Sequence, residues 1–270
     1  MSLLAALSGL ILGSFFNVLI WRLPRGESIV APPSHCTSCG RKIKPWENIP
    51  VLSYILLGGK CAGCKEKISI IYPLIELFTA AASVALWFLF IKNTFTGTVS
   101  FSLSTAVLVQ ALFLLMMIPM SVIDIRHYII PDLLSVTMII AGLAVSFLPG
   151  STTPIQSIIG ILGGGGILYL IGWLGTVIFK KGEAMGGGDI KLMAAAGALF
   201  GIEISLMGII FGALLGSVAG IGMMCFKKLS ADHRIPFGPY LGAGIWIAVL
   251  AGRTIVDAYL SFVERIAAPF

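Results

Sequence analysis

Long runs without a charged residue constrain this chain more than any other feature of its sequence. Residues 1–21 carry no charge, and Leu133–Phe179 continues for 47 residues without one. A helix needs about 20 predominantly apolar residues to cross the hydrocarbon core of a bilayer. Only 11% of the 270 residues are charged, and the mean hydropathy is +1.00. Because about a quarter of a soluble domain is charged, these values exclude a soluble globular protein, a disordered chain and a disulfide-stapled secreted module.

The apolar runs predict an all-α polytopic membrane protein with about eight transmembrane helices. Single spans fit residues 1–21, 68–91, 93–123 and 235–252. We expect 133–179 to hold two spans with a break at Pro149-Gly150, and 192–226 to hold a short span followed by a full one. The first run lacks the basic segment that begins a cleavable signal peptide, so we expect it to remain as a span.

Lys and Arg residues are distributed unevenly between the two sides that this topology creates. Fifteen of the eighteen fall on one side, and eight of these lie between the first two spans. Short loops rich in Lys and Arg stay in the cytoplasm. The bias therefore predicts an extracytoplasmic N-terminus and a cytoplasmic insert at 22–67. It also explains the net charge of +6, together with attraction to anionic membrane lipids, so we expect no nucleic-acid partner.

Two Cys-x-x-Cys pairs lie in the insert. Cys36 and Cys39 are separated from Cys61 and Cys64 by 21 residues. Four thiolates from two such pairs can close a tetrahedron around one zinc ion, and a glycine beside each pair permits a tight turn. Two disulfides are the alternative, and the reducing cytosol argues against them. A thioredoxin-like redox pair is a further alternative, but the insert has no room for its sheet. We therefore predict a structural zinc site.

Three acidic residues lie where the hydropathy places the membrane boundary. Asp124 ends one apolar run, Asp132 opens the next, and Asp189 follows three glycines at the start of another. Ionisable groups at this depth are costly and therefore indicate function. The topology puts Asp124 and Asp189 on the same side of the membrane, where two neighbouring carboxylates would share one proton. One could then activate a water while the other polarises a carbonyl, which is what metal-free peptide hydrolysis requires.

The residues around Asp189 allow a functional and a structural interpretation. The glycines at 186–188 leave the backbone open to an extended substrate, and Lys191 could hold the geometry of the loop or of a carboxylate. Alternatively, an Asp after Gly at a span boundary is often only the N-cap of the following helix. Asp132 follows a proline, so we expect it to cap the helix that it opens.

These motifs together resemble the bacterial type IV prepilin peptidases, which are membrane aspartic proteases of the GxGD kind. The likeness runs through most of the chain. It is carried by Gly13-Ser-Phe-Phe-Asn17-Val18, Arg22-Leu-Pro24-Arg25, Ser34-His-Cys36, Trp46-Glu47-Asn48-Ile-Pro50, Gly59-Lys60-Cys61, Ile71-Tyr72-Pro73-Leu-Ile-Glu76, Ile130-Pro131-Asp132, Gly186-Gly-Gly188-Asp189-Ile-Lys191 and Pro236-Phe237-Gly238-Pro239-Tyr240. A lone GxGD is weak evidence, but its combination with the tetracysteine insert, in this order, is highly specific.

The resemblance implies cleavage of the basic leader from type IV prepilins and pseudopilins, after a glycine and at the cytoplasmic membrane face. In many members, methylation of the new N-terminal residue with S-adenosylmethionine follows. By the resemblance, Asp124 and Asp189 are the catalytic pair, Gly186, Gly188 and Lys191 support the second aspartate's loop, and Cys36, Cys39, Cys61 and Cys64 bind zinc. No glycine fingerprint locates the methyl donor. Glu47, Asn48 and Glu76 are candidates for methyl transfer, and their alternative roles are turn formation and anchoring of the insert to the membrane.

On this interpretation the chain has four parts. They are a first transmembrane helix (1–21), a cytoplasmic zinc-binding domain with the methyltransferase part (22–67), a seven-helix membrane aspartic peptidase domain (68–252) and a C-terminal extracytoplasmic segment (253–270). The expected location is the bacterial inner membrane. The sequence identifies neither the pilin served nor the oligomeric state.

A different class of protein is the alternative. A transport or partner-binding membrane protein could use the zinc knuckle to recruit a partner and the acids to relay protons. Such a protein would place its acids near the bilayer midplane, whereas Asp124 and Asp189 are expected at the cytoplasmic rim. A redox enzyme whose chemistry is in the insert is a further alternative. It would need a quinone or haem pocket, and the three His of the chain show no paired spacing that supports one.

Overall fold

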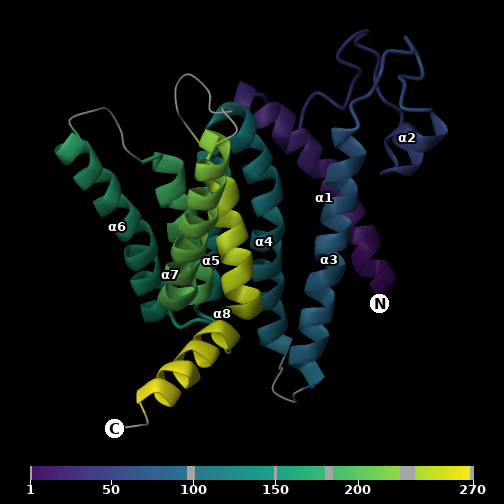
Figure 1. Ribbon diagram of the computed structural model, residues 1–270. Coiled ribbons are helices and arrows are strands. Elements are labelled where there is room, and N and C mark those ends of the chain that lie inside the picture. Colours follow the sequence, from purple (N-terminus) through teal and green to yellow (C-terminus); the bar gives the residue numbers. More distant parts are fainter. Residues whose placement is uncertain (1, 96–100, 149–150, 180–184, 226–234, 268–270) are drawn as a thin grey trace. The chain divides into compact units, whose positions relative to one another are not determined.

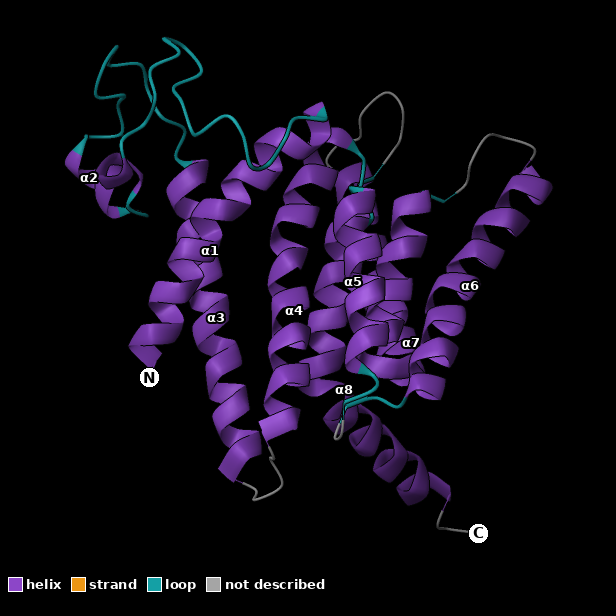
Figure 2. Ribbon diagram, turned by 180° about the vertical axis from the view of Figure 1, so that it is seen from behind, coloured by secondary structure: helices purple, strands orange, loops and turns teal. Residues whose placement is uncertain are grey.

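A computed structural model describes residues 2–95, 101–148, 151–179, 185–225 and 235–267, and most of these residues are helical (Figures 1 and 2). The contacts divide the chain into two compact units, residues 1–100 and 101–270. The first unit holds α1 (Ser2–Arg22), η1 (Leu23–Arg25), η2 (Pro45–Asn48), α2 (Leu52–Leu56) and α3 (Ile71–Phe95). The second unit holds α4 (Phe101–His127), α5 (Asp132–Val145), α6 (Pro154–Phe179), α7 (Gly187–Cys225) and α8 (Gly238–Ala267).

Six of the described helices are long and apolar enough to cross a membrane, namely α1, α3, α4, α6, α7 and α8. α7 has 39 residues, about twice what one crossing needs. Its backbone leaves helical geometry at Gly201 (φ 81°, ψ 178°), so α7 consists of two apolar segments. With the shorter apolar helix α5, the described part of the chain holds eight such segments. The prediction of an all-α polytopic fold is confirmed.

The helix boundaries refine the expected spans. The break expected at Pro149-Gly150 falls outside the described residues, between the end of α5 at Val145 and the start of α6 at Pro154. The run 192–226 divides as expected, and the structure locates the division at Gly201. The last helix continues to Ala267 instead of ending near residue 252, and Figure 1 shows its C-terminal end extending past the other helices of the second unit.

Side chains from α4, from α6 and from the segment just before α6 stabilise the break in α7. A helix end leaves backbone carbonyls without helical donors, and such groups cost several kcal/mol each in hydrocarbon. Gln110 Nε2 and Thr152 Oγ1 donate to the Leu199 carbonyl at 2.8 and 3.0 Å. Ser157 Oγ donates to the Ala198 carbonyl at 2.8 Å. These hydrogen bonds hold the first segment of α7, and with it the first turn that carries Asp189.

Glycines let α7 pack closely against both of its neighbours. A Cβ on Gly160 of α6 would collide with the Gly197 carbonyl of α7, and a Cβ on Gly244 of α8 would collide with the Gly208 carbonyl. Small residues of this kind allow membrane helices to associate through close backbone contact. α7 is therefore firmly held between α6 and α8.

α1 and α3 of the first unit pack in the same way. A Cβ on Gly9 would lie 2.6 Å from Ala80 Cα, and a Cβ on Gly13 would lie 2.6 Å from Glu76 Cα. The Gly-x-x-x-Gly spacing places both glycines on one face of α1. The insert begins after α1 and returns at the start of α3, so these two packed helices hold both of its ends (Figure 1).

Candidate active site

Asp124 lies in the last turn of α4 and is buried, with 6% of its surface exposed. Its Oδ2 accepts a hydrogen bond from the backbone N–H of Gly238, the first residue of α8, at 2.8 Å. A Cβ at position 238 would lie 2.9 Å from this oxygen, so glycine permits the close approach. The start of α8 therefore gives Asp124 a donor and the partial positive charge of a helix N-terminus.

Asp189 lies in the first turn of α7 and is also buried, with 9% of its surface exposed. Because α7 begins at Gly187, Asp189 is its third residue and does not occupy the N-cap position that the structural interpretation requires. The Asp189 and Ile190 N–H groups donate to the Gly186 carbonyl at 3.1 and 3.4 Å, which turns the chain into the helix. A Cβ on Gly186 would lie 3.0 Å from Asp189 Oδ2, so this glycine leaves room for the carboxylate.

Ile130, in the loop between α4 and α5, connects the surroundings of the two aspartates. A Cβ on Gly188 would lie 2.8 Å from Ile130 Cβ, and a Cβ on Gly238 would lie 3.1 Å from Ile130 Cδ1. The loop therefore lies against the first turns of both α7 and α8. Asp124 and Asp189 therefore lie at the same end of the second unit, on either side of the Ile130 loop.

Lys191 forms an ion pair with Asp132 and not with either buried aspartate. Its Nζ lies 2.7 Å from Asp132 Oδ1, and the two side chains are 41% and 67% exposed. The expectation that Asp132 caps α5 is wrong. The N-cap of α5 is Pro131, without a side-chain capping bond, because the Asp132 carboxylate is turned toward Lys191.

Gly238 and Ile130 are the site residues that the sequence does not single out. Both belong to motifs quoted above, but a glycine after Pro236-Phe237 and an apolar residue in a short loop carry little chemical signal on their own. The position of Gly238, 114 residues from Asp124, reveals its role only in the folded chain.

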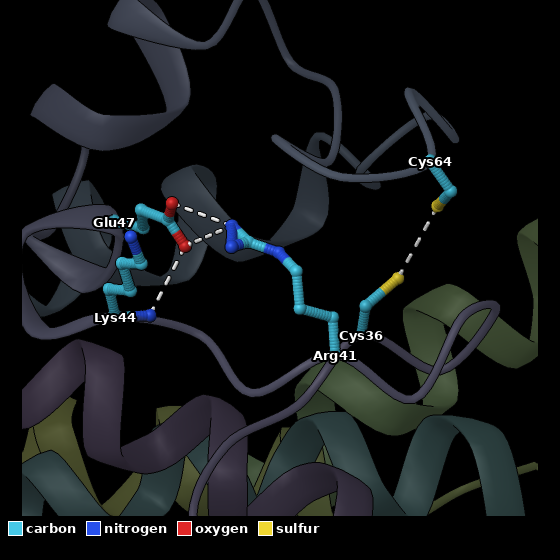
Figure 3. Close-up of polar contacts among 5 residues, drawn as sticks. All are labelled: Cys36, Arg41, Lys44, Glu47 and Cys64. Carbon is cyan, nitrogen blue, oxygen red and sulfur yellow. Dashed lines mark hydrogen bonds and ion pairs between the residues drawn. The ribbon is translucent and has the colours of Figure 1, made fainter.

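The four predicted cysteine ligands gather in the first unit. Their sulfur atoms all lie within 4.8 Å of one another, and Figure 3 shows Cys36 Sγ facing Cys64 Sγ at 3.8 Å. All four cysteines are free thiols, so the disulfide alternative is not observed. Each pair lies in an equivalent turn. The Cys36 N–H donates to the Arg41 carbonyl at 2.9 Å, and the Cys61 N–H donates to the Glu66 carbonyl at 2.8 Å. Four sulfur donors in two facing turns suit Zn²⁺.

Backbone amides prepare the first cysteine of each pair to bind a metal. The N–H groups of Cys39 and Ser38 lower the pKa of Cys36 to about 6. The N–H groups of Cys64 and Gly63 likewise lower the pKa of Cys61. Thiolate is the form that binds metals, so these turns favour the binding-competent state.

Glu47, Asn48 and Glu76, the candidates for methyl transfer, line one cavity of about 380 Å³ in the first unit. Both carboxylate oxygens of Glu47 accept from Arg41 Nη2 at 2.6 Å, and one also accepts from the Lys44 N–H at 3.1 Å (Figure 3). Glu76 is buried and accepts from the Val51 N–H at 2.7 Å. Both acids therefore anchor insert backbone, and both border the same cavity.

Comparisons with known proteins match nearly the whole chain. Residues 7–90 match the bacterial peptidase A24 N-terminal domain, and residues 111–221 match the type IV leader peptidase family. A curated relative from Pseudomonas aeruginosa, named prepilin leader peptidase/N-methyltransferase, is 34% identical over 95% of this chain and 92% of its own length. Relatives of the same name from Aeromonas salmonicida and Xanthomonas campestris are also 34% identical, each over 96% of this chain and over 93% and 94% of their own lengths.

No solved structure matches the chain significantly. The cysteine cluster lies inside the matched N-terminal domain, and both buried aspartates lie inside the matched 111–221 segment. Since two family models and full-length relatives agree, this chain belongs to the type IV leader peptidase family.

Proposed function

We propose that this protein cleaves the leader peptide from type IV prepilins and pseudopilins, with Asp124 and Asp189 as its catalytic carboxylates, and then methylates the new N-terminus. One observation carries the proposal: two buried carboxylates, at the ends of two different helices, lie around the Ile130 loop, inside the segment that matches the leader peptidase family. Family membership supplies the substrate class, and the carboxylate pair supplies the chemistry.

The surroundings of the pair suggest how its single proton is held. Two neighbouring carboxylates do not both ionise readily, because their charges repel at short range. The Gly238 N–H, 2.8 Å from Asp124 Oδ2, favours the ionised form of Asp124. Asp189 then carries the shared proton, and the two residues can act as base and acid.

Peptide hydrolysis follows from these two roles. Asp124 accepts a proton from a water molecule as the water attacks the scissile carbonyl carbon, and Asp189 donates its proton to the carbonyl oxygen. When the tetrahedral intermediate collapses, Asp124 passes its proton to the leaving amine and Asp189 recovers a proton from the hydroxyl group. The pair returns to its starting state.

The start of α7 leaves space for an extended substrate chain. A Cβ on Gly187, the first residue of α7, would meet no atom of the described residues within 4 Å. Gly186 and Gly188 keep side chains away from Asp189 and Ile130. Lys191 acts on the loop indirectly, because its ion pair with Asp132 ties the first turns of α5 and α7 together.

Cys36, Cys39, Cys61 and Cys64 would hold zinc, which when bound supplies a structural cross-link between the two turns. The N-methyltransferase part of the relatives' name implies S-adenosylmethionine, which supplies an electrophilic methyl group. Glu47, Asn48 and Glu76 are assigned to methyl transfer in this chain because they border one cavity.

We place the protein in the bacterial inner membrane, which its apolar helices cross several times. The excess of Lys and Arg supports an extracytoplasmic N-terminus, with the cysteine cluster and both aspartates on the cytoplasmic side. A pilin's apolar helix could then enter among the spans while its basic leader stays in the cytosol. The transporter alternative is not retained, because Asp124 and Asp189 lie at helix ends and not in the middle of spans.

Reconstitution with a prepilin and isotopically labelled S-adenosylmethionine tests both reactions. We expect mass spectrometry of the product to show a leader removed after a glycine and one labelled methyl group on the new N-terminus. An intact leader after incubation with folded, zinc-loaded protein would refute the peptidase proposal. A cleaved but unlabelled pilin would refute the methyltransferase proposal alone.

A further inference from the structure

The outer face of α2, the short helix of the insert, is apolar and exposed. Leu52, Ile55 and Leu56 are 49, 67 and 75% exposed. Residues at i, i+3 and i+4 lie on one side of a helix, so these three side chains form one surface. The other side of α2 lines the cavity of the first unit with Ser53 and Tyr54. An exposed apolar surface of this kind marks a contact with another protein or with a membrane.

A hydrogen bond fixes the depth of α2 along the neighbouring span. The Val51 N–H, directly before α2, donates to Glu76 Oε2 at 2.7 Å. Glu76 is the sixth residue of α3, and the apolar span of α3 already begins at Ile71. A helix rises about 1.5 Å per residue, so α2 begins at the level of the second turn of this span. Figures 1 and 2 likewise show α2 beside the first turns of α3, while the loops that carry the cysteine pairs extend beyond the start of α3.

α3 presents apolar side chains to the lipid at the same level. Leu74, Leu77 and Phe78 are 53, 49 and 64% exposed and belong to its apolar span. Because α3 is one of the membrane-crossing helices, these side chains contact acyl chains. The exposed face of α2 therefore lies at a depth where lipid already covers the protein, and a partner from the aqueous phase does not reach this depth.

The turn before α2 is strained. Val51 has φ 61° and ψ −48°, which is a costly conformation for a β-branched residue. The Leu52 N–H donates to the Pro50 carbonyl at 2.6 Å across it, which closes a γ-turn of the rare, strained form. Strained backbone persists where the surrounding structure holds it, and it often marks a functional position. Here the turn directs the Val51 N–H to Glu76 and thereby places α2 beside the start of α3.

Exposed lysines flank η2 and α2. Lys44 precedes η2 and Lys60 follows α2, and both are exposed. Lys44 Nζ lies 5.2 Å from the centroid of the Trp46 ring, which is also exposed. Trp residues are enriched at the level of the lipid headgroups, and Lys side chains reach from apolar surroundings to this level. The insert at 22–67 contains eight Lys and Arg but three Glu, so its charge suits a membrane surface with anionic lipids.

We propose that α2 anchors the insert in the membrane surface. Leu52, Ile55 and Leu56 enter among the acyl chains beside α3, and Lys44 and Lys60 bind the phosphates of anionic phospholipids. Because the opposite side of α2 lines the cavity, the anchor holds this cavity at the membrane surface. The inference depends on neither of the proposed activities.

Photochemical cross-linking to lipid tests the depth. A benzophenone amino acid replaces Leu56 in protein reconstituted, with zinc present, in vesicles of phosphatidylethanolamine and phosphatidylglycerol that carry radiolabelled acyl chains. We expect a lipid adduct about as abundant as that from the same group at Phe78, and about fivefold or more above that from Lys42, an exposed position beside the first cysteine pair. Lipid adducts from position 56 as rare as those from position 42 would overturn the proposal. Adducts from position 56 with added prepilin in place of lipid would also overturn it and would assign the surface to a protein partner.

The lipid charge tests the two lysines. Replacing phosphatidylglycerol with phosphatidylcholine should lower the lipid adduct from position 56 about threefold or more, and the adduct from position 78 should not change, because the span fixes its depth. Lys44→Gln with Lys60→Gln should cause the same loss in anionic vesicles. The matched control, Lys42→Gln with Lys65→Gln, removes two other exposed lysines of the insert and should retain the adduct. An adduct that neither lipid charge nor the first double variant changes would overturn the headgroup contact, and equal losses in the two double variants would overturn its assignment to Lys44 and Lys60.

Discussion

At the scale of single residues, the surroundings of Asp124 and Asp189 depend on glycines. Gly238 brings a backbone donor to Asp124, and Gly186 leaves space beside Asp189. A buried carboxylate needs hydrogen-bond partners or a neighbour that shares its proton. Gly238 provides such a partner for Asp124, and in the proposed mechanism the two aspartates share one proton.

Replacing either aspartate with asparagine should stop leader cleavage without unfolding the protein. Asparagine keeps the shape of the side chain but can neither act as a base nor hold the shared proton. We expect the rate of leader release from a detergent-solubilised prepilin to fall by roughly 10³-fold or more. Zinc content and thermal unfolding should match those of the wild type. Asp257→Asn, at an exposed position of α8, should cleave normally, and substantial cleavage by Asp124→Asn or Asp189→Asn would contradict the catalytic pair.

Gly238→Ala should lower cleavage through Asp124. The new Cβ would lie 2.9 Å from Asp124 Oδ2 and 3.1 Å from Ile130 Cδ1, so the carboxylate or the loop must move. A displacement of about 1 Å at a reacting group can cost about 100-fold in rate. The control is Gly222→Ala in α7, where a Cβ would meet no atom within 4 Å. Equal cleavage rates for the two variants would show that the Gly238 contact does not position Asp124.

At the scale of helices, the ends of α4, α5, α7 and α8 form the candidate active site, and the middles of the helices hold those ends in place. Polar side chains satisfy the carbonyls before Gly201, and glycines pack α7 against α6 and α8. The exposed Lys191–Asp132 ion pair connects the first turns of α5 and α7.

Breaking this ion pair should affect cleavage more than stability. An exposed pair contributes about 1 kcal/mol or less to folding, because water screens both side chains. Asp132→Asn and Lys191→Gln should each reduce kcat several-fold with little change in Tm, since the loop that carries Ile130 loses a restraint. Exchanging the charges, by Asp132→Lys together with Lys191→Asp, should restore part of kcat. Single effects that simply add in a double-mutant cycle would contradict a coupled restraint.

At the scale of the whole molecule, the two proposed reactions belong to different compact units. The cysteine cluster and the cavity lie within residues 1–100, and both aspartates lie within 101–270. A defect confined to one unit should therefore spare the chemistry of the other.

Cys36→Ser combined with Cys39→Ser tests this separation. The double variant should lose zinc and methylation, because metal-binding free energy is largely the folding free energy of so small a domain. Cleavage should stay within several-fold of wild type, since both proposed catalytic carboxylates remain. Metal analysis and the mass of the pilin N-terminus measure the two outcomes. Retention of zinc and of normal thermal unfolding would contradict the metal site.

The predictable features of this protein are those that a short stretch of sequence specifies. An apolar run of sufficient length must form a helix in lipid, because the backbone has no other way to satisfy its hydrogen bonds there. Cys36 and Cys39 already lie in one turn, as do Cys61 and Cys64, so only the meeting of the two turns required folding. The capping role expected for Asp132 failed because a distant lysine, Lys191, competes for its carboxylate.

The sequence by itself therefore determined the helical membrane fold, the four candidate cysteine ligands and the identity of two aspartates in unusual surroundings, since hydropathy and motif spacing are local properties. Only the tertiary structure decided that Gly238 donates to Asp124, 114 residues away, and that Lys191 pairs with Asp132, 59 residues away. It also decided that Glu76 shares a cavity with Glu47 and Asn48. The physical reason is that these contacts depend on which helix ends are neighbours. The close packing of helices through glycines decides this for all helices of a unit together, and no short stretch of sequence specifies it.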